Sequence, residues 1–391
     1  MSAVEERLAA ARTIGRVLRS GAWANVALRV EAGDSAAVPA VQALVMGLLR
    51  HVPWIDRQIS RAARREIDAL DPPILDLLRV GAHEMREGNR PVPVVVDTLV
   101  SAAKQTAPRA AGFVNAVMRR IAESEPPEAG FPDLGFRQWL VESLERTLGP
   151  DTGAFLQASN QPAAPGVRSN NGFPGAEPVP GIAGAWLWSR GEGPLPPGVA
   201  IQDPSSVAVG LAVDALPGQT VIDVAAAPGG KTGHLLEQVG PGGMVVAADR
   251  HRRRVRDAAR RHPGALWVTA DGARPCVADE SFDRVLLDAP CTGLGTLRRR
   301  PEIRYRVSPE EIERLARLQR DLLETSIRLV RPGGRLVYSV CTVTPDETID
   351  AVAGLGGRPP EDLPGIRVGD GLLLGPHLGP TDGMFICVFD R

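Results

Sequence analysis

From about residue 201 to the C-terminus, short apolar runs alternate with segments of helical length. The runs TVIDVAA, MVVAADR and DRVLLDAP have the length of buried strands, and GMFICVFDR has the same character at the end of the chain. Alternating strands and helices favour a mostly parallel sheet with helices on both faces. We therefore expect residues 201–391 to form a doubly wound, Rossmann-like α/β domain.

The first 124 residues follow a different periodicity. Apolar positions recur three and four residues apart in segments such as VQALVMGLLRHV and FVNAVMRRIAES, which predicts amphipathic helices. The next region begins with Glu125-Pro126-Pro127 and is rich in Gly, Pro and Asn, with short strands expected near GVRSN and AWLWSR. The sequence thus predicts an all-helical domain over 1–124, a linker and small bridging subdomain over 125–200, and the α/β domain over 201–391.

Charge and hydropathy restrict the partners. No apolar run approaches the ~20 residues that span a bilayer, and the N-terminal segment lacks the features of a signal peptide, so we expect a cytoplasmic protein without a membrane partner. The net charge is -1, yet seven arginines lie within 250–262 and five within 298–306. Such clusters either contact phosphates or form solvated faces, and the sequence alone favours neither.

The decapeptide DVAAAPGGKT, 223–232, follows the first predicted strand and leads into a helix. Its glycines let the backbone approach a ligand, and the helix N-terminus favours an anionic group. Only two of the 45 basic residues are lysines, Lys104 and Lys231. Because an ammonium and a guanidinium are not equivalent, a lysine retained in this turn suggests a specific partner such as a carboxylate.

Aspartates end the predicted strands. Asp223 and Asp249 end the first two, and Asp271 and Asp288 end the next two. A carboxylate at the end of the second strand can accept two hydrogen bonds from a ribose diol. Each aspartate taken singly is more often a helix cap. Four at successive carboxyl ends, however, predict a crevice that binds a nucleotide-like cofactor.

The chain has four cysteines, none in a metal-ligand spacing, so we expect no metal. Cys291 follows the fourth strand and Cys341 ends the strand LVYSVC. A lone buried cysteine is usually a small core residue. Two at strand ends beside the cofactor turn suggest a nucleophile whose thiolate is stabilised by nearby positive charge. Cys276 and Cys387 are predicted to have no chemical role.

Several of these motifs resemble the RsmB/Sun (Fmu) family of small-subunit ribosomal RNA cytosine-5 methyltransferases. The similarity lies in DVAAAPGGKT, DAPCTGLGTLRRRPEIR, YSVCTVTPDE and TDGMFICVF. GFVNAVMRR, 112–120, resembles the NusB-like helical domain that this family carries at its N-terminus, and LQASNQPAAPGVRSNN loosely resembles the family's bridge. Two departures are Ala225, where a cysteine is common, and Thr348, where asparagine is common.

The resemblance implies a class I methyltransferase domain that takes the methyl group from S-adenosyl-L-methionine. It implies that Cys341 is the nucleophile, that Cys291 assists product release, and that Asp288 faces both cofactor and base. The cofactor would be held by Ala225, Ala226, Ala227, Pro228, Gly229, Gly230, Lys231, Asp249, Arg254, Asp271 and Asp288. The implied substrate is RNA, most of all 16S ribosomal RNA; we expect a monomer and no DNA partner.

Three other interpretations remain at this point. A nicotinamide-dependent oxidoreductase needs a GxGxxG turn, which this sequence does not supply after its first strand. A non-catalytic RNA-binding protein would not need the paired cysteines. The same methyl transfer to another RNA, such as transfer RNA, would use the same residues.

Overall fold

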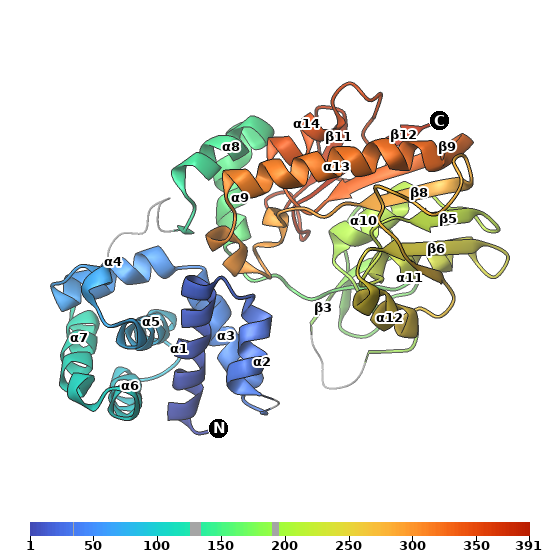
Figure 1. The fold of residues 1–391 in the computed structure, drawn as a ribbon. Coiled ribbons are helices and arrows are strands. Elements are labelled where there is room, and N and C mark those ends of the chain that lie inside the picture. Colours follow the sequence, from blue (N-terminus) through green and yellow to red (C-terminus); the bar gives the residue numbers. More distant parts are fainter. Residues whose placement is uncertain (34, 126–133, 190–194) are drawn as a thin grey trace. The chain divides into compact units, whose positions relative to one another are not determined.

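The computed structural model describes residues 1–33, 35–125, 134–189 and 195–391 (Figure 1). The chain forms two compact units. One contains Met1–Val141 together with Arg299–Arg306, and the other contains Glu142–Arg298 with Val307–Arg391. The linker expected after residue 125 falls largely within 126–133, outside the described residues, so the division into three domains stays a prediction.

The first unit is helical. Its helices are α1 Ala3–Ser20, α2 Ala24–Ala32, α3 Val38–Leu49, α4 Val52–Ala63, α5 Pro72–Glu87, α6 Val92–Thr106 and α7 Ala111–Glu123. The Ser2 hydroxyl accepts from the Glu5 amide at 3.3 Å, and the Glu5 carboxylate accepts from the Ser2 amide, which forms a capping box at the start of α1. Within the described residues no single helix is long and apolar enough to cross a membrane; α3 and α4 pass that test only as a pair, bent by 81°.

Helix α5 is the centre of this unit. All residues from 74 to 84 are buried, which a helix reaches only when others surround it, and Figure 1 shows α5 enclosed by its neighbours. Its buried charges are therefore paired. Glu84 accepts from Arg7 of α1 at 3.0 Å, and Asp76 accepts from Arg19 of α1 at 2.6 Å and from Arg79 at 3.2 Å. Removing one partner of such a pair leaves an uncompensated buried charge.

The segment 299–306 belongs to the helical unit although it comes from the second half of the sequence. The Tyr305 hydroxyl donates to the Leu49 carbonyl at the end of α3, at 2.7 Å. The Arg306 guanidinium lies 4.1 Å from the centroid of the Trp23 ring. At least part of this arginine cluster therefore packs inside the protein. The sequence had suggested only phosphate contacts or a solvated face.

The second unit contains an eight-stranded sheet in the order β10-β11-β12-β9-β8-β5-β6-β7. Its strands are β5 Thr220–Asp223, β6 Met244–Asp249, β7 Leu266–Thr269, β8 Phe282–Asp288, β9 Val330–Val340, β10 Ile366–Val368, β11 Gly371–Leu374 and β12 Met384–Asp390. The five strands from β7 to β9 pair in parallel, and β12, β11 and β10 continue the sheet antiparallel. The predicted mostly parallel, doubly wound sheet is confirmed.

Helices cover both faces of this sheet. The main ones are α10 Pro204–Val213, α11 Gly230–Val239, α12 Arg252–Arg261 and α13 Pro309–Leu329. Apolar residues of α10 and α11 pack on one face of the strands, and Figure 1 shows α13 on the other. The chain order reverses between β5 and β8. At such a switch point the carboxyl ends of neighbouring parallel strands are the usual place for a ligand.

Smaller elements lie between residues 138 and 201, and one more follows β9. They are α8 Gln138–Leu148, α9 Thr152–Ser159, α14 Ile349–Val352, and the strands β1 Gly166–Arg168, β2 Ala176–Pro178, β3 Ala185–Trp188 and β4 Ala200–Ile201. The four strands form a separate sheet in the order β2-β3-β1-β4. The strands expected near GVRSN and AWLWSR correspond to β1 and β3, which pair antiparallel.

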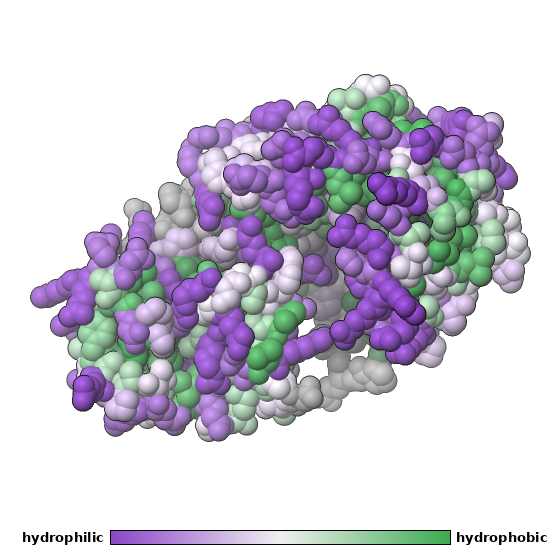
Figure 2. Space-filling model, in the orientation of Figure 1, coloured by the Kyte–Doolittle hydropathy of each residue, from purple (hydrophilic) through white to green (hydrophobic). Residues whose placement is uncertain are grey.

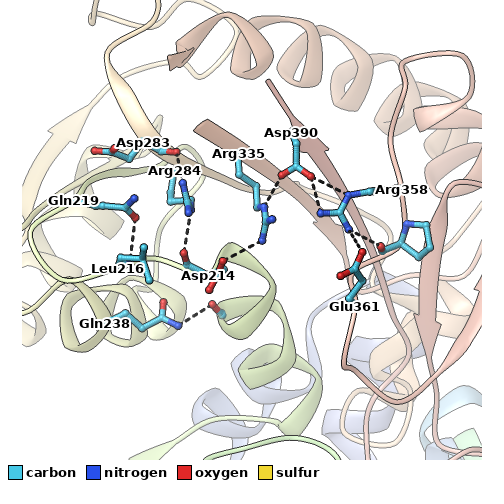
Figure 3. A network of polar contacts seen from close by, with 12 residues as sticks. Asp214, Leu216, Gln219, Gln238, Asp283, Arg284, Arg335, Arg358, Glu361 and Asp390 are labelled. Carbon is cyan, nitrogen blue, oxygen red and sulfur yellow. Dashed lines mark hydrogen bonds and ion pairs between the residues drawn. The ribbon is translucent and has the colours of Figure 1, made fainter. Parts of the chain in front are cut away.

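An arginine–carboxylate network lies at the end of the sheet where the parallel strands begin (Figure 3). Arg335 of β9 and Arg358 both donate to Asp390 of β12, at 2.7 and 2.6 Å, and Arg335 also reaches Asp214 at 3.4 Å. Burial by itself raises the pKa of Asp390, but the hydrogen bonds from the two arginines lower it overall. The network therefore links β9 to the antiparallel strand β12. It does not involve the carboxyl ends of the parallel strands.

Acid should weaken the helical unit through its buried histidines. Burial, with smaller contributions from Arg86 and Arg50, lowers the pKa of His83 to about 4. In the unfolded chain the pKa of this imidazole is about 6.5. The neutral side chain therefore stabilises the fold fully above pH 6.5, and this contribution of about 3 kcal/mol is lost as the pH falls toward 4. Hydrogen exchange of α3–α5 amides, corrected for intrinsic rates, measures the loss. His83→Phe should show a weaker pH dependence; an unchanged one would contradict the prediction.

Candidate active site

The turn after β5 contains the residues predicted to hold a cofactor. Strand β5 ends at Asp223, and α11 begins at Gly230 after a tight turn. Gly229 has φ +101°, and a Cβ there would lie 2.6 Å from the His262 ring, so only glycine suits this position. The Thr232 hydroxyl, in the first turn of α11, donates to the buried Asp223 carboxylate at 2.7 Å. Burial raises the pKa of Asp223 to about 7.

Asp249, at the end of β6, joins the same turn. One of its oxygens accepts from the His251 amide at 2.8 Å and the other from the Ala227 amide at 3.3 Å. The Arg254 guanidinium lies 3.8 Å from Asp249 and donates to the Ala227 carbonyl. The structure therefore brings together three residues that the sequence analysis assigned to the cofactor.

Asp271 is placed differently. It lies two residues beyond the end of β7, is exposed, and accepts from the Ala273 amide at 3.1 Å. Within the described part of the chain, no hydrogen bond joins its side chain to Asp249 or Asp288. Asp271 shares the edge of the sheet with the other aspartates, but its side chain forms only a local turn.

Lys231 connects the turn to β8 and β9. Its ammonium donates to Asp288, the last residue of β8, at 2.6 Å, and to the Ser206 hydroxyl at 3.3 Å. The other oxygen of Asp288 accepts from Ser339 of β9 at 2.8 Å. Burial by itself lowers the pKa of Lys231, but Asp288, with a smaller contribution from Cys341, raises it overall, so the side chain stays charged.

The two cysteines singled out by the sequence lie in contact. Their Sγ atoms are 3.3 Å apart, although the residues are fifty positions apart in the chain. The hydrogen bond with Cys341, burial and nearby negative charge raise the pKa of Cys291 well above its ordinary value. Cys276 is exposed, and Cys387 is buried in β12 with its thiol donating to the Asp370 carbonyl.

Glu347 is a residue of this site that the sequence analysis missed. Its fully buried carboxylate accepts five hydrogen bonds, from the Thr292 amide at 2.8 Å, the Gln319 amide at 3.1 Å, and the hydroxyls of Thr292, Thr342 and Thr344 at 2.6, 3.2 and 2.7 Å. Thr292 follows Cys291, and Thr342 and Thr344 follow Cys341. One carboxylate therefore fixes both cysteine loops. An acidic residue among threonines just after Cys341 was the available signal.

A close backbone approach adds to this arrangement. The Gly295 amide donates to the Cys341 carbonyl at 2.9 Å, and its own carbonyl accepts from Gly383, just before β12, at 2.9 Å. A Cβ at Gly295 would lie 2.0 Å from the Gly383 carbonyl oxygen. Glycine is therefore required where the loop after Cys291 passes between β9 and β12.

Comparison with known proteins gives the same outline. Residues 211–389 match the family model described as 16S rRNA methyltransferase RsmB/F, and residues 4–123 match the NusB family. Ribosomal RNA small subunit methyltransferase B of Thermus thermophilus is 38% identical over 89% of this chain and 87% of its own. A putative methyltransferase of Mycobacterium tuberculosis is 33% identical over 98% and 96%.

A solved structure extends the comparison to the fold. The crystal structure of PH0851 aligns with a TM-score of 0.77 at 22% identity, over all of this chain and 99% of that chain. Fold and matches together define a Rossmann-like, S-adenosylmethionine-dependent methyltransferase domain joined to a NusB-like helical domain, as the sequence predicted. The chain belongs to the RsmB/F family of 16S ribosomal RNA methyltransferases.

Truncation of Glu347 should destabilise the methyltransferase unit. Glu347→Ala leaves five donors without their acceptor, which we expect to cost at least about 3 kcal/mol of unfolding free energy. Glu347→Gln keeps one acceptor oxygen, and the threonine hydroxyls can rotate to accept from its amide, so it should cost about 1 kcal/mol. Hydrogen exchange of β9 amides measures both. Equal destabilisation in the two variants would contradict this account.

Proposed function

We propose that this protein transfers a methyl group from S-adenosylmethionine to carbon 5 of a cytosine in small-subunit ribosomal RNA. The observation that carries the proposal is the pair of sulfur atoms 3.3 Å apart, beside the Lys231–Asp288 ion pair. Membership of a 16S rRNA methyltransferase family supports the substrate class. A protein that only binds RNA would have no chemical need for two thiols in contact.

The residues around the turn suit the cofactor. S-adenosylmethionine carries a ribose diol and an amino-acid group with one positive and one negative charge. Asp249 accepts one backbone hydrogen bond on each oxygen and keeps lone pairs for a diol. Lys231 and Asp288 offer a cation and an anion side by side. Next to them, a Cβ at Gly230 would meet no atom within 4 Å, so the backbone there is open to a ligand.

When bound, the cofactor supplies an electrophilic methyl group on a sulfonium. The protein must make carbon 5 of cytosine nucleophilic, because an aromatic pyrimidine carbon is a poor nucleophile. In the proposal the Cys341 thiolate forms a bond to carbon 6, which breaks the 5,6 double bond and moves its electrons toward carbon 5. The charged Lys231 ammonium and Cys341 are close enough to interact electrostatically.

The neighbouring groups take the remaining roles. Asp288 is fixed by Lys231 and Ser339 and can bind the ring edge of the base. Cys291, with its raised pKa, stays a thiol and hydrogen-bonds Cys341. After methylation, solvent water takes the proton from carbon 5 and the electrons of that C–H bond re-form the 5,6 double bond. The bond from carbon 6 to sulfur then breaks and Cys341 leaves as a thiolate; we assign Cys291, whose thiol can donate its hydrogen bond to that thiolate, to this release step. The base must leave its stack to reach these groups.

The two cysteines should respond differently to removal. Cys341→Ala should abolish methylation, read by bisulfite sequencing of ribosomal RNA, and still bind S-adenosylmethionine. Cys291→Ala should form the bond to RNA but release it slowly, giving an adduct that survives denaturing electrophoresis. Cys276→Ala, which changes an exposed thiol outside the pair, is the control and should behave as the unaltered protein. Normal turnover by Cys341→Ala would refute the mechanism; methylation of transfer RNA alone would refute the substrate.

The aspartates should differ in their effect on the cofactor. Asp249→Asn removes one acceptor from the proposed ribose contact, so the affinity for S-adenosylmethionine should fall by about tenfold, or about 1.4 kcal/mol. Asp271→Asn should change it less, since Asp271 is exposed and bonded only within its own turn. Isothermal titration calorimetry compares the two variants. A larger decrease with Asp271→Asn would reverse the assignment.

A further inference from the structure

Helix α12 carries an unusual concentration of positive charge. Its ten residues, RRRVRDAARR, contain six arginines and one aspartate, a net charge of 6 − 1 = +5. All six arginines are exposed, and its two buried residues, Val255 and Ala258, are the ones that face the sheet unit. Figure 2 shows hydrophilic residues over the region where Figure 1 places α12.

These charges are only partly neutralised within the described part of the protein. No carboxylate of the described residues lies within ion-pair distance of Arg252 or Arg253, and Arg256 and Arg260 share only Asp257, at 3.8 and 3.9 Å. Helix α13 on the opposite face of the sheet is different. Its 21 residues hold five acidic and four basic side chains. Two of its exposed arginines, Arg314 and Arg317, pair with glutamates in the preceding turn at 2.8 and 2.6 Å.

The arrangement on α12 costs helix stability. Arg252, Arg253 and Arg254 occupy the first turn, where the helix dipole favours acidic residues. Arg252 and Arg256, and then Arg256 and Arg260, are four residues apart, a spacing at which like charges destabilise a helix by a few tenths of a kcal/mol per pair. Folding stability therefore does not account for this face, whereas binding of a polyanion does.

The position of the helix connects this face to the active site. Arg254, in the first turn, contacts Asp249 and the Ala227 carbonyl of the cofactor turn. The other exposed arginines continue from there along the helix. The exposed face has no apolar or aromatic side chain, which an interface with another protein normally has at its centre. A positively charged face that lacks apolar surface is suited to bind the phosphate backbone of a nucleic acid.

We propose that Arg252, Arg253 and Arg256 of α12 bind backbone phosphates of the substrate RNA next to the target base. This rests on the proposed function for the identity of the polyanion. Contacts of this kind position the strand and do not read its sequence, so they set affinity and salt dependence more than choice of nucleotide. The second arginine cluster, at 299–306, is partly occupied by packing in the helical unit.

The test compares two triple variants that remove the same number of charges. Arg252→Gln/Arg253→Gln/Arg256→Gln changes α12, and the control, Arg314→Gln/Arg317→Gln/Arg320→Gln, changes α13. Filter binding to an in vitro transcribed small-subunit ribosomal RNA is measured from 50 to 300 mM KCl, without cofactor. For α12 the slope of log K against log [KCl] should fall in magnitude by about 2 to 3, since each phosphate that is no longer neutralised lowers it by about 0.7–0.9, and affinity at 100 mM should drop at least about tenfold. The control should stay within about twofold.

Three results would overturn the proposal: equal slopes for the α12 variant and the unaltered protein, equal decreases in both variants, or a loss of polyglutamate binding by the α12 variant with RNA binding unchanged. The last would point to an acidic protein. Because the variant removes repulsion, its melting temperature should equal or exceed that of the unaltered protein. Binding is measured apart from methylation, so failure of this proposal is distinguishable from failure of the proposed chemistry, which the cysteine variants report.

Discussion

The parallel pairing of β8 with β9 is the constraint on which the active site depends. Its register places Asp288 opposite Ser339 at the ends of the two strands. The chain leaves β8 toward Cys291 and leaves β9 at Cys341, so the ladder delivers both thiols to the same edge. A shift of this register by one residue would turn every side chain of one strand to the other face. The contact between the sulfur atoms therefore depends first on the register of β8 and β9, and only then on the conformation of the loops.

The loops that carry the two cysteines are also held in place by a buried carboxylate, that of Glu347. Glu347 holds both cysteine loops through five donors and, among the described residues, no ion pair. Five donors are one more than the roughly four lone-pair sites of a carboxylate, so both of its oxygens are fully used. Asp223 differs, because in the part of the chain that the structure describes its carboxylate accepts from one side chain, the Thr232 hydroxyl, and burial raises its pKa to about 7.

Positive charge is divided in a similar way. The arginines at 299–306 come from the methyltransferase half of the sequence, and two of them, Arg304 and Arg306, lie over the rings of Phe136 and Trp23 in the helical unit. Those of α12 stay on the surface next to the cofactor turn. Lys231, one of two lysines in the chain, is paired with Asp288 and kept charged. Packing inside the protein, the proposed phosphate binding and the pairing with Asp288 thus belong to different basic residues, which composition alone does not distinguish.

The sequence by itself determined the helical first third, the alternation that makes a doubly wound sheet, and the turn DVAAAPGGKT, because these depend on local periodicity and on residues close together in the chain. It also singled out Cys291 and Cys341. Only the tertiary structure decided that their sulfur atoms touch, that Glu347 binds both loops, that Asp271 makes a local turn, and that 299–306 joins the helical unit. Each of these depends on strand register and packing between residues far apart in sequence. Local sequence patterns do not determine which distant residues come into contact. The strand order and register of the folded sheet do.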